Sequence, residues 1–136
     1  MSRLRTLAAI AAFWMSPVPG WAASITGTYC GAVLSSGEMT DVVTRLKQEA
    51  DGRITGSYKF MDGETPVTGS LIARGAPGAV QYDFLWRDKF GSGKVVITPA
   101  ADGNSFTGKW GTGANPPEHD WLGKRCADQA EPGIAS

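Results

Sequence analysis

Histidine and cysteine are scarce in this chain of 136 residues, which has a single histidine, His119, and two cysteines, Cys30 and Cys126. One histidine and two distant cysteines do not form the ligand set of a zinc site, so we expect no metal and no cofactor. His119 lies between Glu118 and Asp120, but neighbouring residues of a strand point to opposite faces and do not act together on one substrate. No other catalytic pattern is present, and we do not expect an enzyme.

Net charge is also missing, because 13 basic side chains balance 13 acidic ones. Such a chain has neither the basic footprint of a nucleic-acid-binding protein nor a polybasic patch for anionic lipid. Long apolar runs are absent as well, since the run over 7–14 is far shorter than the ~20 residues that span a bilayer. We therefore expect no nucleic-acid partner and no membrane insertion.

The first residues have the three zones of a secretory signal peptide. Arg3 and Arg5 supply the positive start, a short apolar run follows, and small residues end the segment. Cleavage after Ala22 puts Gly20 and Ala22 at the small-residue positions, so the predicted signal peptide is 1–22. No lipobox cysteine follows the apolar run. We therefore predict a periplasmic or secreted protein.

The two cysteines are predicted to form a disulfide, because the compartment of an exported chain is oxidising. They lie near the two ends of the predicted mature domain, 23–126. A closure of this length is worth roughly 4 kcal/mol in the chain-entropy model. The alternative is a pair of free buried thiols.

Turn signals such as Asp51-Gly52 recur at short intervals, with runs rich in β-branched and aromatic residues between them. This spacing is typical of an all-β sandwich or barrel. The predicted strands are 25–33, 40–49, 53–61, 66–74, 79–88, 93–99, 105–111 and 119–126. Because the connections are hairpin-length, we predict an all-β fold, an eight-stranded antiparallel up-and-down β-barrel closed by one disulfide.

The alternation within the strands favours one buried and one wet face. In 79–88, Val80, Tyr82, Phe84 and Trp86 share one face and the other is largely polar. A membrane barrel would instead turn an apolar face outward over the full depth of a bilayer. The pattern therefore predicts an apolar interior.

Two segments are less regular. The apolar spacing in 40–50 also suits a helix, but the β-branched run Val42-Val43-Thr44 favours a strand. The tail 127–136 has no periodic apolar residues, and we expect it to be disordered.

Glycines recur on the predicted inner face. Five strands place a glycine between two same-face residues, as in Val67-Gly69-Leu71 and Trp121-Gly123-Arg125. Glycine weakens a flat strand, but it lets a strand coil sharply in a small barrel while a neighbouring aromatic ring covers the gap. The pattern therefore favours a barrel over a flat sandwich, although a glycine-rich chain also produces such spacings by chance.

Several short runs resemble the opening half of avidin-like proteins. They are Ile25-Thr-Gly-Thr-Tyr29, Ala50-Asp-Gly-Arg-Ile-Thr-Gly-Ser-Tyr58, Thr68-Gly-Ser-Leu71 and Phe84-Leu-Trp86. More loosely, Gly27-Thr-Tyr29 and Arg125 look like the calycin group, which includes lipocalins and avidins. The resemblance implies a small calycin-type barrel in which an aromatic residue of the first strand packs against a basic residue of the last.

The same comparison argues against biotin as the ligand. Tyr58 and Trp86 fall where avidin-like proteins keep biotin-contacting aromatics, and Ser35 matches a contacting serine. Gly31, however, stands where an asparagine is expected, and Phe60 where a serine is expected. A buried urea-like group without its polar partners is left unsatisfied, so biotin binding is not expected.

Barrel closure gives Tyr29 and Arg125 a structural role. In a closed meander the first and last strands are neighbours. If Cys30 faces Cys126, Tyr29 lies diagonal to Arg125 on the opposite face, within cross-strand reach. We therefore predict a stack of the Tyr29 ring on the Arg125 guanidinium rather than a ligand contact.

The aromatic interior is the one feature with functional potential. The predicted ligand-binding residues are Tyr58, Phe84, Trp86, Trp110 and Trp121, which would all face one cavity. We expect a small apolar or aromatic ligand. Aromatic rings also serve as plain core filler. The alternative is a filled barrel that acts as a protein-interaction module of the cell envelope, an inhibitor or accessory protein, through loops 33–40 and 111–119.

Overall fold

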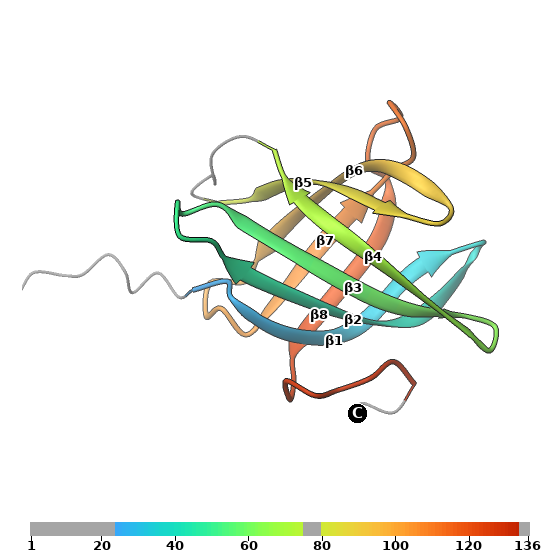
Figure 1. Cartoon of the computed structure of the whole chain (residues 1–136), viewed down its shortest axis with the longest axis horizontal. Helices are drawn as coiled ribbons and strands as arrows, with labels where there is room; N and C mark the ends of the chain where they lie inside the picture. The colour runs from blue at the N-terminus through green and yellow to red at the C-terminus, as the bar shows by residue number, and fades with distance from the viewer. Residues whose placement is uncertain (1–23, 75–79, 134–136) are drawn as a thin grey trace, which may run out of the picture.

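The structure, a computed structural model, describes residues 24–74 and 80–133 and forms one closed antiparallel barrel (Figure 1). Each strand pairs with the next in sequence, and the last pairs with the first. The predicted eight-stranded up-and-down barrel is confirmed. The strands are β1 (Gly27–Ser35), β2 (Glu38–Gln48), β3 (Ile54–Asp62), β4 (Thr65–Ala73), β5 (Tyr82–Asp88), β6 (Gly91–Pro99), β7 (Ser105–Trp110) and β8 (His119–Arg125).

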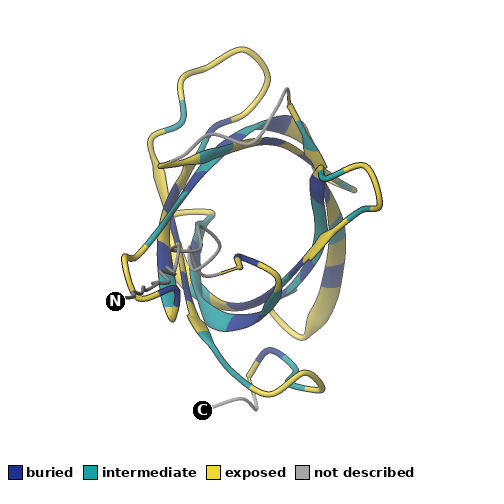
Figure 2. Cartoon of the chain, turned by 90° about the vertical axis from the view of Figure 1, so that its left-hand side faces the viewer, coloured by how far each residue is buried: buried dark blue, intermediate teal, exposed yellow. Residues whose placement is uncertain are grey.

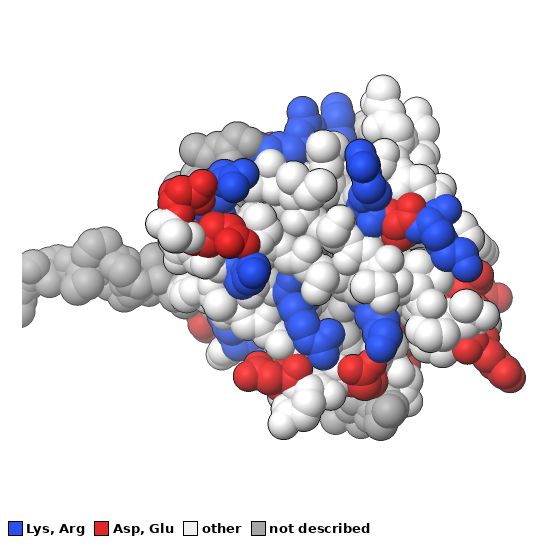
Figure 3. Space-filling model, in the orientation of Figure 1, with Lys and Arg blue, Asp and Glu red and all other residues white. Residues whose placement is uncertain are grey.

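The expected signal peptide, 1–22, lies outside the described residues. Within the two described stretches, no helix has the length and apolarity needed to cross a membrane. On the face shown in Figure 3, basic and acidic side chains are interspersed rather than gathered into a field of one sign.

The segment 40–50 belongs to a strand. Val42, Val43 and Thr44 of β2 are all buried, and Val42 pairs in register with Phe60 of β3. The β-branched residues therefore decided between strand and helix, as expected.

The predicted loop 33–40 is wrong. β1 runs to Ser35 and β2 starts at Glu38, so the connection is the two-residue turn Ser36-Gly37. Both residues have positive φ angles, 52° and 81°, as in the type I′ turns that match the twist of paired strands. In β5 the strand begins at Tyr82, and Val80, which we expected on the inner face, is 70% exposed.

Buried and exposed residues alternate along the strands around the barrel wall (Figure 2). Two glycines on the inner face are covered by aromatic rings from the neighbouring strand. Gly69 pairs with Tyr58 and Gly123 pairs with Phe106, and a Cβ at either glycine would run into the ring of its partner. The expected use of glycine under aromatic rings is confirmed at these two positions.

The seam between β1 and β8 is closed on both faces. Cys30 and Cys126 form the predicted disulfide, with an S–S distance of 2.08 Å and a Cα–Cα distance of 5.7 Å. We expected the two cysteines to lie directly opposite each other and Tyr29 to lie diagonal to Arg125, and the structure shows the reverse. Tyr29 lies directly opposite Arg125 and Cys30 opposite Lys124, so the disulfide spans the diagonal. Cys126 lies just past the end of β8, where its N–H donates to the carbonyl of Thr28 at 3.0 Å.

Arg125 closes the end of the barrel next to the seam. Its guanidinium carbon lies 4.9 Å from the centroid of the Tyr29 ring, which confirms the predicted stack. The guanidinium also donates to the carbonyls of Gly103, Thr26 and Ser24. A single side chain therefore ties the chain before β1 and the β6–β7 turn to the last strand.

The interior at this end is filled. The Tyr29 hydroxyl donates to the carbonyl of Ile25 at 2.7 Å, and the Tyr29 and Phe106 rings meet edge to face with centroids 5.0 Å apart. Phe84, which we expected to line the ligand cavity, is 1% exposed in this packed core.

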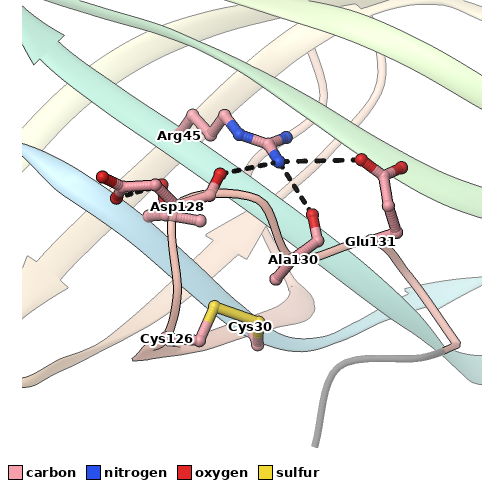
Figure 4. The surroundings of a disulfide bond; sticks show 7 residues. Cys30, Arg45, Cys126, Asp128, Ala130 and Glu131 are labelled. Atoms are coloured by element: carbon pink, nitrogen blue, oxygen red, sulfur yellow. Dashed lines mark hydrogen bonds and ion pairs between the residues drawn. A yellow bond between two sulfur atoms is a disulfide. The ribbon is translucent and has the colours of Figure 1, made fainter.

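The tail 127–136 was expected to be disordered, yet residues 127–133 lie against the outside of the barrel beside the disulfide (Figure 4). Arg45 donates to the carbonyl of Ala130 at 2.8 Å, and Lys59 pairs with Glu131 at 2.8 Å. Val43 lies on the outer face of the barrel, in register with Cys30 and Lys59, and yet it is fully buried. The expectation is wrong for 127–133, because polar contacts with the wall hold a segment that lacks apolar periodicity. Residues 134–136 lie outside the described residues.

Replacing both cysteines, Cys30→Ala with Cys126→Ala, is expected to lower the free energy of unfolding by roughly 4 kcal/mol, because the loop that the disulfide closes spans 96 residues. Urea unfolding followed by tryptophan fluorescence measures the change. An unchanged midpoint would show that the disulfide adds nothing to the seam.

Arg125→Met is expected to destabilise the barrel by about 2–3 kcal/mol, since it leaves backbone carbonyls without their donor. Arg125→Lys should recover part of the loss, and Lys124→Met, on the outer face, is the control. Equal stability of the two methionine variants would contradict the role assigned to Arg125.

Candidate functional site

A cavity of about 300 Å³ occupies the end of the barrel opposite Arg125. Its rim includes Ser36 in the β1–β2 turn, Phe90 in the β5–β6 turn, and Thr112 in the segment between β7 and β8. This volume is at the lower end of the range for small-molecule sites. The barrel is thus filled at one end and hollow at the other.

Aromatic residues make up six of the thirteen that line the cavity. The rings that line the cavity are those of Tyr58, Phe60, Trp86, Phe90, Trp110 and Trp121. Four of the five predicted ligand-binding residues are among them, and Phe84 is not, because it lies one inward step along β5 from Trp86 towards the filled end. Whether these residues bind a ligand stays a prediction.

The rings fix one another by edge-to-face contacts. The centroids of Tyr58 and Trp121 are 4.9 Å apart with ring planes at 77°, and those of Trp86 and Trp110 are 5.5 Å apart with planes at 86°. Such T-shaped pairs are a preferred aromatic geometry. Each ring of these two pairs is therefore held by its partner.

Each indole N–H of the wall already donates to a protein oxygen. Trp86 donates to the carbonyl of Gly111 at 2.8 Å, and Trp121 donates to the Thr44 hydroxyl at 3.0 Å. Trp110 donates to the carbonyl of Leu34 at 3.2 Å. The indole N–H groups are therefore not available to a ligand, and the three tryptophans contribute apolar ring surface to the cavity.

Two carboxylates also line the cavity, Asp62 at the end of β3 and Asp88 at the end of β5. Oδ2 of Asp88 accepts from the Tyr58 hydroxyl at 2.6 Å, and Oδ1 accepts from the N–H of Phe90 at 2.8 Å. Burial and the Asp88 carboxylate raise the pKa of Tyr58. The phenol therefore stays protonated and keeps donating to Asp88.

The sequence contained a signal for these aspartates that we did not use. Tyr58 and Phe60 are inward residues of β3, and Phe84 and Trp86 are inward residues of β5. Side chains of a strand alternate between its two faces, so Asp62, two residues after Phe60, and Asp88, two residues after Trp86, are expected to face inward as well. Neither aspartate is among the predicted site residues.

His119 and Asp120 do not form a catalytic pair. The His119 ring lies 4.8 Å from the Trp110 ring, whereas Asp120 pairs with Lys109 on β7. Within 24–74 and 80–133, no group of three His, Cys, Asp or Glu side chains is arranged to hold a metal ion.

Gly31, where the resemblance led us to expect an asparagine, has no room for a side chain. A Cβ at this position would run into the carbonyl oxygen of Leu122 on β8. The close approach of β1 and β8 at the seam therefore requires a glycine here.

Comparison with known proteins found no match: no family model, no curated protein and no solved structure matches the chain.

Stability is expected to fall as the pH rises above about 10, where tyrosine in an unfolded chain ionises. Burial raises the pKa of Tyr29, with Arg125 opposing the shift, and the pKa of Tyr58 is raised as well. The unfolded chain then releases protons that the fold retains. The free energy of unfolding should therefore drop by up to about 1.4 kcal/mol per pH unit for each of the two tyrosines.

Urea unfolding between pH 8 and pH 11 measures this slope, and Tyr58→Phe should make it shallower. Stability that does not change between pH 9 and pH 11 would contradict the assigned burial of both phenols.

Proposed function

We propose that the protein is an exported, calycin-like carrier or sensor that binds a small apolar or aromatic ligand in the open end of its barrel. The observation that carries this proposal is the cavity itself, about 300 Å³ in volume and walled by aromatic rings. A plain structural core would bring such rings into contact with no space between them.

The order of the wall supports the same function. The indole N–H groups donate to Gly111, Leu34 and Thr44, so protein contacts fix the orientation of the three rings. A binding site that is already formed avoids the entropy cost of ordering side chains on binding.

The disulfide between Cys30 and Cys126 supports export to the periplasm or the outside of the cell, because disulfides persist in oxidising compartments. This agrees with the signal peptide expected over 1–22.

The alternative function, a protein-interaction module with a filled barrel, has less support. The barrel has a cavity, and one of the two loops expected to contact a partner is the tight turn Ser36-Gly37. The other loop, 111–118, is tied to β6 by the N–H groups of Gly111 and Gly113, which donate to the carbonyls of Lys94 and Ser92.

The test uses the neutral dye N-phenyl-1-naphthylamine, whose emission rises in apolar surroundings. The purified full chain is expected to bind it with one site per barrel. Ser35→Trp places a bulky ring on the cavity lining and should weaken binding about tenfold or more, because it removes volume from the site.

Thr107→Trp, which adds the same ring on an exposed position of β7, is the matched control and should bind the dye as the native chain does. Absence of dye binding, or equal affinity for the native chain and Ser35→Trp, would overturn the proposal.

A further inference from the structure

If small ligands bind in the cavity as proposed above, its charges and hydrogen-bond donors restrict their chemistry. On that basis we propose that the ligand is an organic cation, an aromatic or apolar body bearing an ammonium or quaternary ammonium group, seated among the aromatic rings and beside the Asp88 carboxylate.

The charge of the cavity lining favours a cationic ligand. Among the described residues that line the cavity, Asp62 and Asp88 are the charged ones, and both are acidic. Asp88 is partly buried, where the attraction between a carboxylate and a cation is less damped by water than at a free surface. An anionic ligand would have to enter against both aspartates.

Among the described lining residues, no side chain offers a charged hydrogen-bond donor to an anionic head group. The three indole N–H groups are used by protein oxygens, and the Tyr58 hydroxyl donates to Asp88. Among the described lining side chains, the remaining hydroxyls are those of Ser35, Ser36 and Thr112. A carboxylate or phosphate head group would lack the charged donors that such groups require on burial.

The aromatic rings that line the cavity also favour a cation. Aromatic faces carry the negative part of the ring quadrupole, and they attract cations that approach within about 6 Å of the centroid. The rim already shows this contact, since the Lys89 ammonium lies 5.4 Å from the centroid of the exposed Phe90 ring. Trp86, Trp110 and Trp121 also line the cavity, and tryptophan is the side chain that attracts cations most strongly.

Asp88 is also placed to act as a fixed counter-ion. The Tyr58 hydroxyl and the Phe90 N–H each hold one of its oxygens. An ionised carboxylate has about four acceptor sites, so two such bonds leave capacity for a ligand. The bonds hold the negative charge at the mouth without neutralising it.

The experiment compares two probes of the same shape that differ in charge, phenyltrimethylammonium and tert-butylbenzene, with benzoate as the anionic probe. Each is titrated against the dye-loaded full chain. The cation is expected to displace the dye about tenfold more effectively than its neutral isostere, and benzoate is expected to be the weakest.

Asp88→Asn keeps an acceptor for the Tyr58 hydroxyl and removes the charge. This variant should bring the affinities for the cation and the neutral isostere within about threefold of each other. Asp83→Asn, an exposed position on the same strand, removes the same charge outside the cavity and should leave the preference intact.

The outcomes separate the two proposals. If none of the probes nor the dye binds, the small-ligand function itself fails. If the neutral isostere or benzoate binds as tightly as the cation, or if Asp88→Asn keeps the full preference, ligand binding stands and the cation inference is overturned.

If Asp88→Asn does not fold, Asp62→Asn and added salt decide the matter. Both should weaken the binding of the cation and leave that of the neutral isostere unchanged, because salt screens charge attraction. A cation affinity that responds to neither would overturn the inference.

Discussion

The meeting of β1 and β8 is the constraint on which the rest of the molecule depends. On the inner face Tyr29 stacks on Arg125, and on the outer face Cys30 is bonded to Cys126, so one seam is held from both sides. Residues 127–133 then lie over the outer side of this closure. Because Arg125 and its carbonyl partners close the adjacent end of the barrel, access to the interior is left to the opposite end.

The interior divides accordingly into a filled half and a hollow half. At the Arg125 end Tyr29, Phe84 and Phe106 belong to the buried core, and Gly123 allows the Phe106 ring to lie against the backbone. Towards the mouth the rings are larger and meet edge to face, Tyr58 with Trp121 and Trp86 with Trp110, and a cavity remains among them. Aromatic residues thus form the packed core at one end of the barrel and the cavity wall at the other. At the cavity end the indole N–H groups are hydrogen-bonded to protein oxygens.

The fold was predictable because its signals are local. Turn residues and a period of two specify hairpins, and hairpins in series leave closure as the natural outcome for eight strands. The site was only partly predictable. Alternation tells which residues face inward, and it placed Tyr58 and Trp86 correctly, but depth along the axis depends on strand tilt and register, so Phe84 was assigned to the cavity. The contacts of Arg45 and Lys59 with the tail have no periodicity and left no signal of this kind.

The order of the strands has a consequence for how the chain reaches this state. β1 and β8, which pair at the seam, are the first and last strands of the chain. Their pairing brings together Cys30 and Cys126, which are 96 residues apart in sequence. Until His119–Arg125 arrives, the sheet has two open edges with unpaired backbone groups, which are templates for aggregation. Closure at such long range is slow to form. A chain that ends before β8 can hide neither edge, and the C-terminal strand therefore protects the whole sheet as well as completing it.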